Sequence, residues 1–594
     1  MSVDDGRTHF GHKLEVELMG NSSSVPGSGA TPSSRTTLFS PPETMTSPLH
    51  KRKRTLSQQT SDCASLDDCV YSPLSDAVMS RDVESSSDPV DSRLGGFDLD
   101  MGRGLQSEFK LEGKWVTVRM EKGEISWQES GPRFPKCYDT RKTGWVMITD
   151  ILAGVHVQPG DVCRCTSCCD QFHKLVIHTY TAKNGKTSEW VPFSYSFCSP
   201  DGDTVVKWAS KINAVLSSNK ERPRKLWVFV NPYGGHKQAK QIWQNKVYPT
   251  FRLAGIKCTV LFTTHSNHAF DVIKEATSQD IGKYDGLIAI GGDGFFQEIL
   301  NGVLARSNKP WSDNEAVHRS LRLGHIPAGS MDAVAWSLHG TRSVMSATLR
   351  IVFGDRLPLD VMRIETGSGG SRYSACLAGY GFMGDISRAS ERLRWMGPLR
   401  YDIAGVMVFL LSRSHRARII YNPAGPPPPV SQNVCVGPCS WCKGNEEAAP
   451  REEGPIVCRP AASAINSTSP ISSPFKTLEG DFISIIATVT PCRSDKSQHG
   501  ITPYAHLGDG RMHLVLVRKT SRLNYLKWLH SLTKTGVQPG KFKFVETIDA
   551  TAVCVEPVHG KSAWNVDGEV LGEQTLSAVV HRGLVDVFSR GIQG

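Results

Sequence analysis

The fold of this chain is decided by residues 286–302, which read GLIAIGGDGFFQEILNG. The apolar run at 286–290 predicts a buried strand, and it leads directly into the Gly-Gly-Asp-Gly turn at 291–294. Apolar residues then recur at helical spacing through Leu304, which predicts an amphipathic helix. Glycines at a strand end let backbone N–H groups approach phosphate oxygens, because no Cβ atom intervenes. The stretch therefore predicts a phosphate-binding turn between a strand and a helix.

Two further turns of small residues follow apolar strands in the same region. Asn231-Pro232-Tyr233-Gly234-Gly235 follows the strand at 226–230, and Pro327-Ala328-Gly329-Ser330 forms the third turn. A strand at 256–262 and a helix at 267–278 continue the alternation, so residues 222–358 predict an α/β domain with a parallel sheet. Such sheets bind ligands at the carboxyl ends of their strands. A plain strand-to-helix turn would explain one set of glycines, but not three, so we expect a nucleotide site there.

Composition sets the limits of this interpretation. At ~100–200 residues per domain, 594 residues predict three or four domains. The hydrophobic share of 39% is enough to bury cores, which excludes a wholly disordered chain or a coiled coil. A net charge of +10 suits an anionic membrane surface or a phosphate-bearing ligand. The excess of positive charge is spread too widely along the chain to indicate nucleic-acid binding, and we expect no nucleic-acid partner.

The segment before the α/β domain divides into two parts. Residues 1–104 are rich in Ser and poor in aromatic residues, which predicts a disordered tail. Residues 105–218 show several alternating strands and then a helix over 201–218, capped by Asp203 or Thr204. The apolar face of that helix is formed by Val205, Trp208, Ala209, Ile212 and Leu216.

Many strands followed by one amphipathic helix resemble a pleckstrin-homology domain, a β-barrel with a C-terminal helix. The resemblance implies binding of phosphoinositide headgroups through basic residues. The candidates are Lys110, Lys114, Arg119 and Lys122. The alternative is a domain used only for protein contacts or dimer formation.

Residues 359–594 are strand-rich and carry a low-complexity insertion at 422–474. The longest apolar stretch near a helix is 406–411, far short of the ~20 residues that a bilayer requires. The N-terminus has no basic start followed by an apolar run, so we expect no signal peptide and a cytoplasmic protein. We expect membrane contact to be peripheral, through the pleckstrin-homology-like domain and the helix around 404–411. Ordinary core packing is the alternative for that helix.

Other nucleotide-binding motifs are absent from the sequence. It contains no GxxxxGK[ST] loop and no protein-kinase HRDxxxxN or DFG motif. The GxGxxG match at 379–384 lies in the strand-rich half, outside a βαβ unit, and does not indicate a dinucleotide fold.

The Gly-Gly-Asp-Gly turn, the Asn-Pro-Tyr-Gly-Gly turn and Asp567-Gly568-Glu569 together resemble the diacylglycerol-kinase catalytic family, which includes sphingosine and ceramide kinases. The resemblance covers about residues 222–594. The runs at 379–386 and 390–402, and the Asp that ends Gly-Ser-Met-Asp at 329–332, resemble the ceramide-kinase branch more than the sphingosine kinases. The resemblance to this family implies a nucleotide-binding domain joined to a β-sandwich that holds the lipid, with ATP in the cleft between them.

The resemblance also implies roles for individual residues. The nucleotide is expected to contact Asn231, Pro232, Gly234, Gly235, Thr263, Gly291, Gly292, Gly294, Gly329 and Ser330, with Arg394 and Arg400 at its phosphates. Asp293 is the implied catalytic acid that takes the proton from the lipid hydroxyl, and Glu569 is a second candidate. Asp332 and Asp385 are implied to bind the substrate, and Asp509 to organise Mg²⁺. For Asp293, Glu569 and Asp509, an ordinary turn carboxylate is the alternative.

Cysteines form two groups in the sequence. Cys435, Cys439 and Cys442 resemble a cluster associated with ceramide kinases, but a closed zinc site needs four ligands and only Cys458 follows. Zinc binding, redox sensitivity and simple loop packing all remain open for them. The cysteines at 163–169 include an adjacent pair that cannot easily bind one tetrahedral ion, which favours incidental cysteines there.

The combined expectation is a kinase that transfers the γ-phosphoryl group of ATP to the primary hydroxyl of ceramide, assisted by Mg²⁺. A sphingoid-base or diacylglycerol kinase is the alternative within enzymes. A membrane-docking adaptor that binds nucleotide without catalysis is the alternative outside them.

Overall fold

The computed structural model describes most of the chain beyond residue 103. The described residues are 104–130, 143–159, 172–235, 237–306, 321–367, 370–397, 399–411, 413–425, 435, 439, 442, 475–558, 562–572 and 575–592. The predicted tail at 1–104, except Gly104, and the cysteines at 163–169 lie outside these residues.

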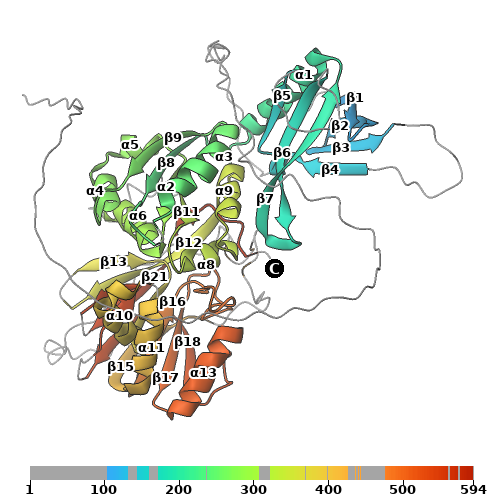
Figure 1. The fold of residues 1–594 in the computed structure, drawn as a ribbon. Coiled ribbons are helices and arrows are strands. Elements are labelled where there is room, and N and C mark those ends of the chain that lie inside the picture. The colour runs from blue at the N-terminus through green and yellow to red at the C-terminus, as the bar shows by residue number, and fades with distance from the viewer. Residues whose placement is uncertain are drawn as a thin grey trace, which may run out of the picture. The chain divides into compact units, whose positions relative to one another are not determined.

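The first folded segment is a seven-stranded antiparallel sheet followed by one helix (Figure 1). Its strands run in the order β4-β3-β2-β1-β7-β6-β5. Their bounds are β1 Leu105–Leu111, β2 Lys114–Glu121, β3 Glu124–Glu129, β4 Thr143–Met147, β5 Ala153–Val157, β6 His173–Lys183 and β7 Lys186–Ser199.

The helix of this segment, α1 (Gly202–Ser218), buries the apolar face that its spacing predicts. Trp208 lies at the centre, with its ring 5.7 Å from that of Phe109 on β1. The predicted cap was wrong, because Asp201 caps the helix and its side chain accepts from the backbone N–H of Asp203. Asp201 has the extended backbone that an N-cap requires, whereas Asp203 is already inside the helix.

Residues 225–353 form the predicted α/β arrangement. Four parallel strands run in the order β9-β8-β10-β11. The strands are β8 Lys225–Val230, β9 Lys257–Phe262, β10 Gly286–Gly291 and β11 Arg322–Pro327. The helices are α2 Ala239–Ile242, α3 Tyr248–Leu253, α4 His268–Glu275, α5 Ser278–Gly282, α6 Asp293–Ala305, α8 Ala333–His339 and α9 Val344–Phe353, with a π-helical turn at Trp243–Val247.

Strand β10 is buried along its whole length because helices cover both faces of the sheet. Leu287 and Ala289 pack into one apolar cluster with α4 and α6. Ile288 and Ile290 point the other way, into a cluster with α3 and α9. This alternation explains why the strand reads as a continuous apolar run.

The strand-rich half folds around its own core. Its strands are β12 Leu357–Thr366, β13 Ser371–Ser374, β14 Leu377–Gly381, β15 His415–Pro423, β16 Lys476–Thr488, β17 Met512–Arg518, β18 Val545–Pro557, β19 Trp564–Val566, β20 Glu569–Leu571 and β21 Leu576–Val587. Its helices are α10 Phe382–Arg392, α11 Leu399–Leu411 and α13 Arg522–Thr535. Strand β16 pairs with β15 along its first part and with β14 and β17 along its last.

Strand β21 joins the two halves into one sheet. It pairs antiparallel with β12 and β18 and then parallel with β11, where Leu323 lies opposite Val587. The residues that follow pack under the α/β domain, since Phe588 belongs to the cluster with α3 and α9. The end of the predicted 359–594 segment therefore completes the core of the segment before it.

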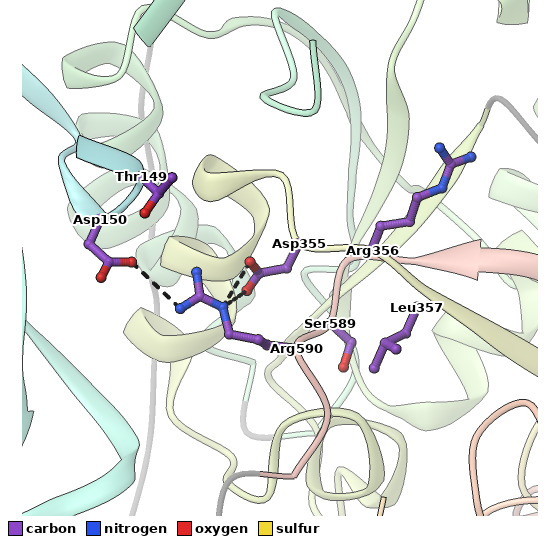
Figure 2. Close-up of a pocket in the computed structure, with 7 residues that line it drawn as sticks. All are labelled: Thr149, Asp150, Asp355, Arg356, Leu357, Ser589 and Arg590. Atoms are coloured by element: carbon purple, nitrogen blue, oxygen red, sulfur yellow. Dashed lines mark hydrogen bonds and ion pairs between the residues drawn. The ribbon is translucent and has the colours of Figure 1, made fainter. Parts of the chain in front are cut away.

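Arg590 lies at a contact between the first sheet and the α/β domain. Figure 2 shows its guanidinium between Asp355, at 2.9 Å, and Asp150, at 3.6 Å. Burial raises the pKa of Asp355, and the Arg590 charge opposes that increase. The pocket around Arg590 is lined by Thr149, Asp150, Asp355, Arg356, Leu357, Ser589 and Arg590. No residue of the glycine-rich turns lines it, so it is separate from the predicted nucleotide site.

Candidate active site

The three predicted turns meet at the carboxyl ends of β8, β10 and β11. Gly235 has a positive φ of 56°, and a Cβ atom there would lie 2.4 Å from the carbonyl oxygen of Ala328. A Cβ atom on Gly329 would lie 2.5 Å from the Cα of Gly292. The turns therefore pack backbone against backbone, which only glycine permits at these positions.

Local hydrogen bonds shape the first of these turns. The Asn231 side-chain oxygen accepts from the backbone N–H groups of Tyr233, at 3.0 Å, and Gly234, at 3.1 Å. The Asn231 backbone N–H donates to the carbonyl oxygen of Ile290, which ties the turn to β10. Thr263 is buried, and its backbone N–H donates to Val230 at the end of β8.

The second turn leaves room for a ligand. Gly292 caps α6, and a Cβ atom on Gly294 would meet no described atom within 4 Å. Ser330 in the third turn is exposed. Backbone N–H groups at a helix start, bordered by open space, can bind the oxygens of a phosphate.

Asp293 is held by the start of α8. Its Oδ2 accepts from the backbone N–H of Ala333 at 2.9 Å, and its Oδ1 from that of Val334 at 2.8 Å. These bonds give the carboxylate a fixed orientation, and each oxygen keeps a further lone pair for another donor.

Asp332 supports the third turn from inside the protein. It is 1% exposed, and its Oδ1 accepts from the backbone N–H of Gly329 at 2.8 Å. Its Oδ2 lies 3.3 Å from an Arg342 nitrogen. Burial raises the pKa of Asp332, and the negative charge of Asp293 raises it further.

Asp567 comes from the turn between β19 and β20 and lies within electrostatic range of Asp293. Its Oδ1 accepts from the backbone N–H of Leu377 at 2.9 Å. Its Oδ2 is buried and makes no hydrogen bond of good geometry among the described residues, although the Ser374 hydroxyl favours its ionised form. Burial, with a contribution from the charge of Asp293, raises the pKa of Asp567 to about 7.

Glu569, the second predicted acid, has a different environment. It is exposed, and its Oε2 lies 2.7 Å from a guanidinium nitrogen of Arg372 on β13. Its carboxylate is therefore held by a cation rather than by backbone N–H groups.

Glu298 is a further acid in the same region that the sequence analysis did not select. Its Oε1 accepts from the backbone N–H groups of Ala269, at 2.8 Å, and Phe270, at 3.4 Å, at the start of α4. Burial raises the pKa of Glu298, whereas these hydrogen bonds to its carboxylate act to lower it. Its position within residues 286–302, five residues after Asp293, is the sequence feature that could have indicated it.

Asp509 lies in a buried polar network of the strand-rich half. Its Oδ1 accepts from the backbone N–H of Arg511, and its Oδ2 lies 3.8 Å from His513 Nε2. Burial raises the pKa of Asp360, and the charge of Asp509 adds to the increase. Burial alone would lower the pKa of His513, but hydrogen bonds to Asp509 and Asp549 raise it to about 9.

Asp385 lies in the first turn of α10. Its Oδ1 accepts from the Ser562 hydroxyl at 2.8 Å, and its Oδ2 lies 3.4 Å from His415 Nε2. Arg400 on α11 donates to the Tyr401 hydroxyl. Arg394 lies in a short 3-10 helix, and its side chain is outside the described part of the chain.

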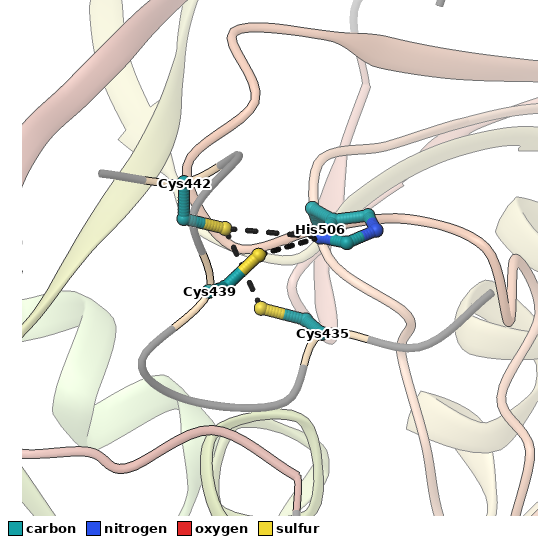
Figure 3. Close-up of side chains that lie close together, drawn as sticks. All are labelled: Cys435, Cys439, Cys442 and His506. Carbon is teal, nitrogen blue, oxygen red and sulfur yellow. Dashed lines mark hydrogen bonds between the residues drawn. The ribbon is translucent and has the colours of Figure 1, made fainter. Parts of the chain in front are cut away.

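The three predicted cysteines converge on His506 (Figure 3). Cys435 and Cys442 are 3.4 Å apart at their Sγ atoms, and Cys439 Sγ lies 3.2 Å from His506 Nδ1. The fourth member is thus a histidine from the segment between β16 and β17, which no local spacing in the sequence indicates. Cys458 lies outside the described residues.

Two family models match the chain. Residues 225–364 match the diacylglycerol kinase catalytic domain, and residues 460–594 match the ceramide kinase C-terminal domain.

Three curated relatives extend this similarity, and each is named ceramide kinase. The protein from Mus musculus is 31% identical over 507 residues, covering 78% of this chain and 92% of its own length. The protein from Homo sapiens is 32% identical over 452 residues, with coverages of 70% and 82%. The protein from Oryza sativa subsp. japonica is 30% identical over 529 residues, with coverages of 71% and 86%.

Proposed function

The chain belongs to the ceramide kinase family, and on that basis we propose that it transfers the γ-phosphoryl group of ATP to the primary hydroxyl of ceramide. The observation that carries the proposal is the meeting of three glycine-rich turns beside Asp293. The turns present backbone N–H groups where phosphates would bind, and the carboxylate provides a proton acceptor next to them.

We assign the general base to Asp293. The lipid hydroxyl oxygen forms the new bond to the γ-phosphorus, the bond from that phosphorus to the β-γ bridging oxygen breaks, and ADP leaves. The hydroxyl proton passes to an Asp293 oxygen. The α8 N–H groups fix the direction of this carboxylate, and positioning supplies much of the catalysis in phosphoryl transfer.

The environment of Asp567 fits a bound Mg²⁺. Its Oδ2 is buried without a good hydrogen bond, and Asp293 provides a second carboxylate within electrostatic range. Carboxylate oxygens are the protein ligands that Mg²⁺ prefers. When bound, the ion would neutralise charge on the phosphates. The partners of Asp509 belong to a different network, so we propose Asp567 and Asp293 for this role instead.

Two further acids serve the substrates in this proposal. Asp332 positions the nucleotide turn through Gly329 rather than contacting the lipid. Asp385, with Ser562 and His415, offers an acceptor and neighbouring polar groups for the amide N–H and hydroxyl of a ceramide headgroup.

A comparison of lipids in mixed micelles tests the substrate. With ceramide, sphingosine and diacylglycerol presented side by side, we expect kcat/KM for ceramide to be at least about 100-fold higher, because a site built to hydrogen-bond a polar group rejects an analogue that lacks it. Greater efficiency on either other lipid would replace the ceramide assignment. Nucleotide binding without lipid-dependent ATP consumption would instead support the adaptor.

Helix α11 is the proposed membrane contact. Only Ala404 of this helix is buried, whereas Leu399, Val406, Met407, Leu410 and Leu411 are exposed. None of the described helices has the length and apolarity needed to cross a bilayer. An exposed apolar surface on such a helix is suited to lying in the membrane interface.

Charged substitutions on α11 should weaken this contact. We expect Met407→Glu/Leu410→Glu to reduce co-sedimentation with ceramide-containing vesicles by about tenfold or more, since burying a Leu or Met side chain contributes about 1.5–3 kcal/mol. Activity on a water-soluble short-chain ceramide should stay near that of the unmodified chain. Tyr248→Glu, at an exposed site on α3 outside both proposed membrane contacts, is the control. Unchanged co-sedimentation of the double variant would exclude α11 as the contact.

The first sheet and α1 support a pleckstrin-homology-like docking role. The basic residues of this proposal lie on β1 and β2 and in the turn after β2. Lys114 pairs with Glu129 at 2.8 Å, and Arg119 donates to the Gln106 side chain. Together with Lys110 and Lys122, these two basic residues are proposed to bind anionic lipid headgroups.

A further inference from the structure

The cluster of Cys435, Cys439, Cys442 and His506 lies outside the proposed kinase site and takes no part in the proposed chemistry. Each of the four residues is at most 3% exposed. Their potential ligand atoms, three sulfurs and one ring nitrogen, all lie within 4.8 Å of one another (Figure 3).

Three of the separations are close to the edges of a tetrahedron around zinc. With Zn–S near 2.3 Å and Zn–N near 2.0 Å, tetrahedral angles place neighbouring ligand atoms about 3.5–3.8 Å apart. Cys435 Sγ and Cys442 Sγ are 3.4 Å apart. His506 Nδ1 lies 3.2 Å from Cys439 Sγ and 3.9 Å from Cys442 Sγ. The other pairs of ligand atoms lie within 4.8 Å of one another, so movements of up to about 1 Å would place the four atoms around one ion.

We propose that Cys435, Cys439, Cys442 and His506 bind one structural zinc ion. Zinc binds as Zn²⁺ while the three thiols release their protons to solvent, which leaves a net charge of −1 on the site with a neutral imidazole. Four protein ligands fill a tetrahedral shell, so the ion has no open position for substrate or water. Its role is therefore structural rather than catalytic.

The contacts of the cluster explain what such an ion would stabilise. The cysteines come from the insertion between β15 and β16, whose low-complexity composition offers little apolar surface of its own. The Cys435 carbonyl oxygen accepts from the backbone N–H of Ile592, and the carbonyl oxygen of Leu507, next to His506, accepts from Asp360. The ion would thus join the insertion, the segment before β17 and the C-terminal residues.

A disulfide is the alternative for this cluster, but it would involve only two of the four residues. Cys435 and Cys442 are near enough to be oxidised after a small movement, since an S–S bond is about 2.05 Å long. Such a bond would leave Cys439 and His506 close together without a common function. The four-fold convergence and full burial favour a metal.

Metal content of the full chain tests the proposal. The chain, purified under reducing conditions without chelator, is expected to contain zinc by inductively coupled plasma mass spectrometry. His506→Ala and Cys439→Ser should each lose about one equivalent, whereas His506→Cys should keep it, because Cys₄ is also a common zinc site. Cys258→Ser, which changes a half-buried thiol on β9 outside the cluster, is the control. Measuring the difference between variants excludes any zinc held by the cysteines at 163–169.

Cobalt substitution gives a readout that does not depend on the variants folding. Co²⁺ exchanged into the unmodified chain should show the intense visible bands of a tetrahedral thiolate site, and His506→Cys should shift them. Absence of zinc and of these bands from the unmodified chain would overturn the proposal. So would equal zinc in His506→Ala and the unmodified chain, or a Cys435–Cys442 disulfide in peptide maps of the reduced preparation.

Discussion

Asp293→Asn is expected to lower kcat for lipid phosphorylation by about 1,000-fold. General-base catalysis contributes about 10²–10⁴-fold, and the amide of Asn cannot take the hydroxyl proton. Asn also has only one acceptor oxygen, whereas Asp293 accepts from two N–H groups of α8. We therefore expect a stability loss of about 1–3 kcal/mol as well. Radiolabelled phosphate transfer and thermal unfolding measure the two effects separately.

Glu569→Gln is the matched comparison, because it neutralises the other candidate acid. Its pairing with Arg372 and its exposure predict a loss of only about tenfold in kcat. A variant at Asp293 that keeps kcat within tenfold would remove the base assignment. If the Glu569 variant loses as much as the Asp293 variant, the base is shared or lies at Glu569.

Gly235→Ala is expected to weaken ATP binding by about 100-fold. The new Cβ would lie 2.4 Å from the carbonyl oxygen of Ala328, so the first and third turns must move apart. A displacement of about 1 Å in a positioning element can cost about 100-fold in rate or affinity. Isothermal titration with ATP and the KM for ATP measure this effect directly.

Gly255→Ala is the control that separates the effect of the Cβ contact with Ala328 from the effect of backbone strain. Gly255 has a φ of 72°, but a Cβ atom there would meet no described atom within 4 Å. Both variants lose about 1 kcal/mol to the left-handed conformation, and only Gly235→Ala disturbs the turns. Equal ATP affinities in the two variants would show that the turn contact does not hold the nucleotide.

The local features of this protein could be predicted because they depend on neighbouring residues. The alternation of strands and helices, the buried face of α1 and the glycine turns all follow from periodicity and from the conformational freedom of glycine. The helix cap was missed by two residues, since several polar side chains near Asp201 could serve and only the backbone angles select one.

The environment of each acid could not be predicted in the same way. Asp293 was the first candidate acid in the sequence and Glu569 the second, and the structure shows that Asp293 is held by helix N–H groups whereas Glu569 is paired with arginine. Asp509 and Asp567 both precede glycine, but Asp567 is buried where the charge of Asp293 contributes to its raised pKa, whereas Asp509 lies 3.8 Å from His513 Nε2. These differences depend on strands that are far apart in the sequence and are brought together by sheet pairing.

By itself the sequence determined a parallel α/β unit, three glycine turns and a family of lipid kinases. Those properties depend on residue types and their spacing, and both can be recognised within a short segment of the chain. Only the tertiary structure decided that β21 completes the sheet beside β11, that Asp567 is buried within electrostatic range of Asp293 and that His506 joins the three cysteines. Strand register and core packing set such contacts, and they depend on the whole chain rather than on any one segment.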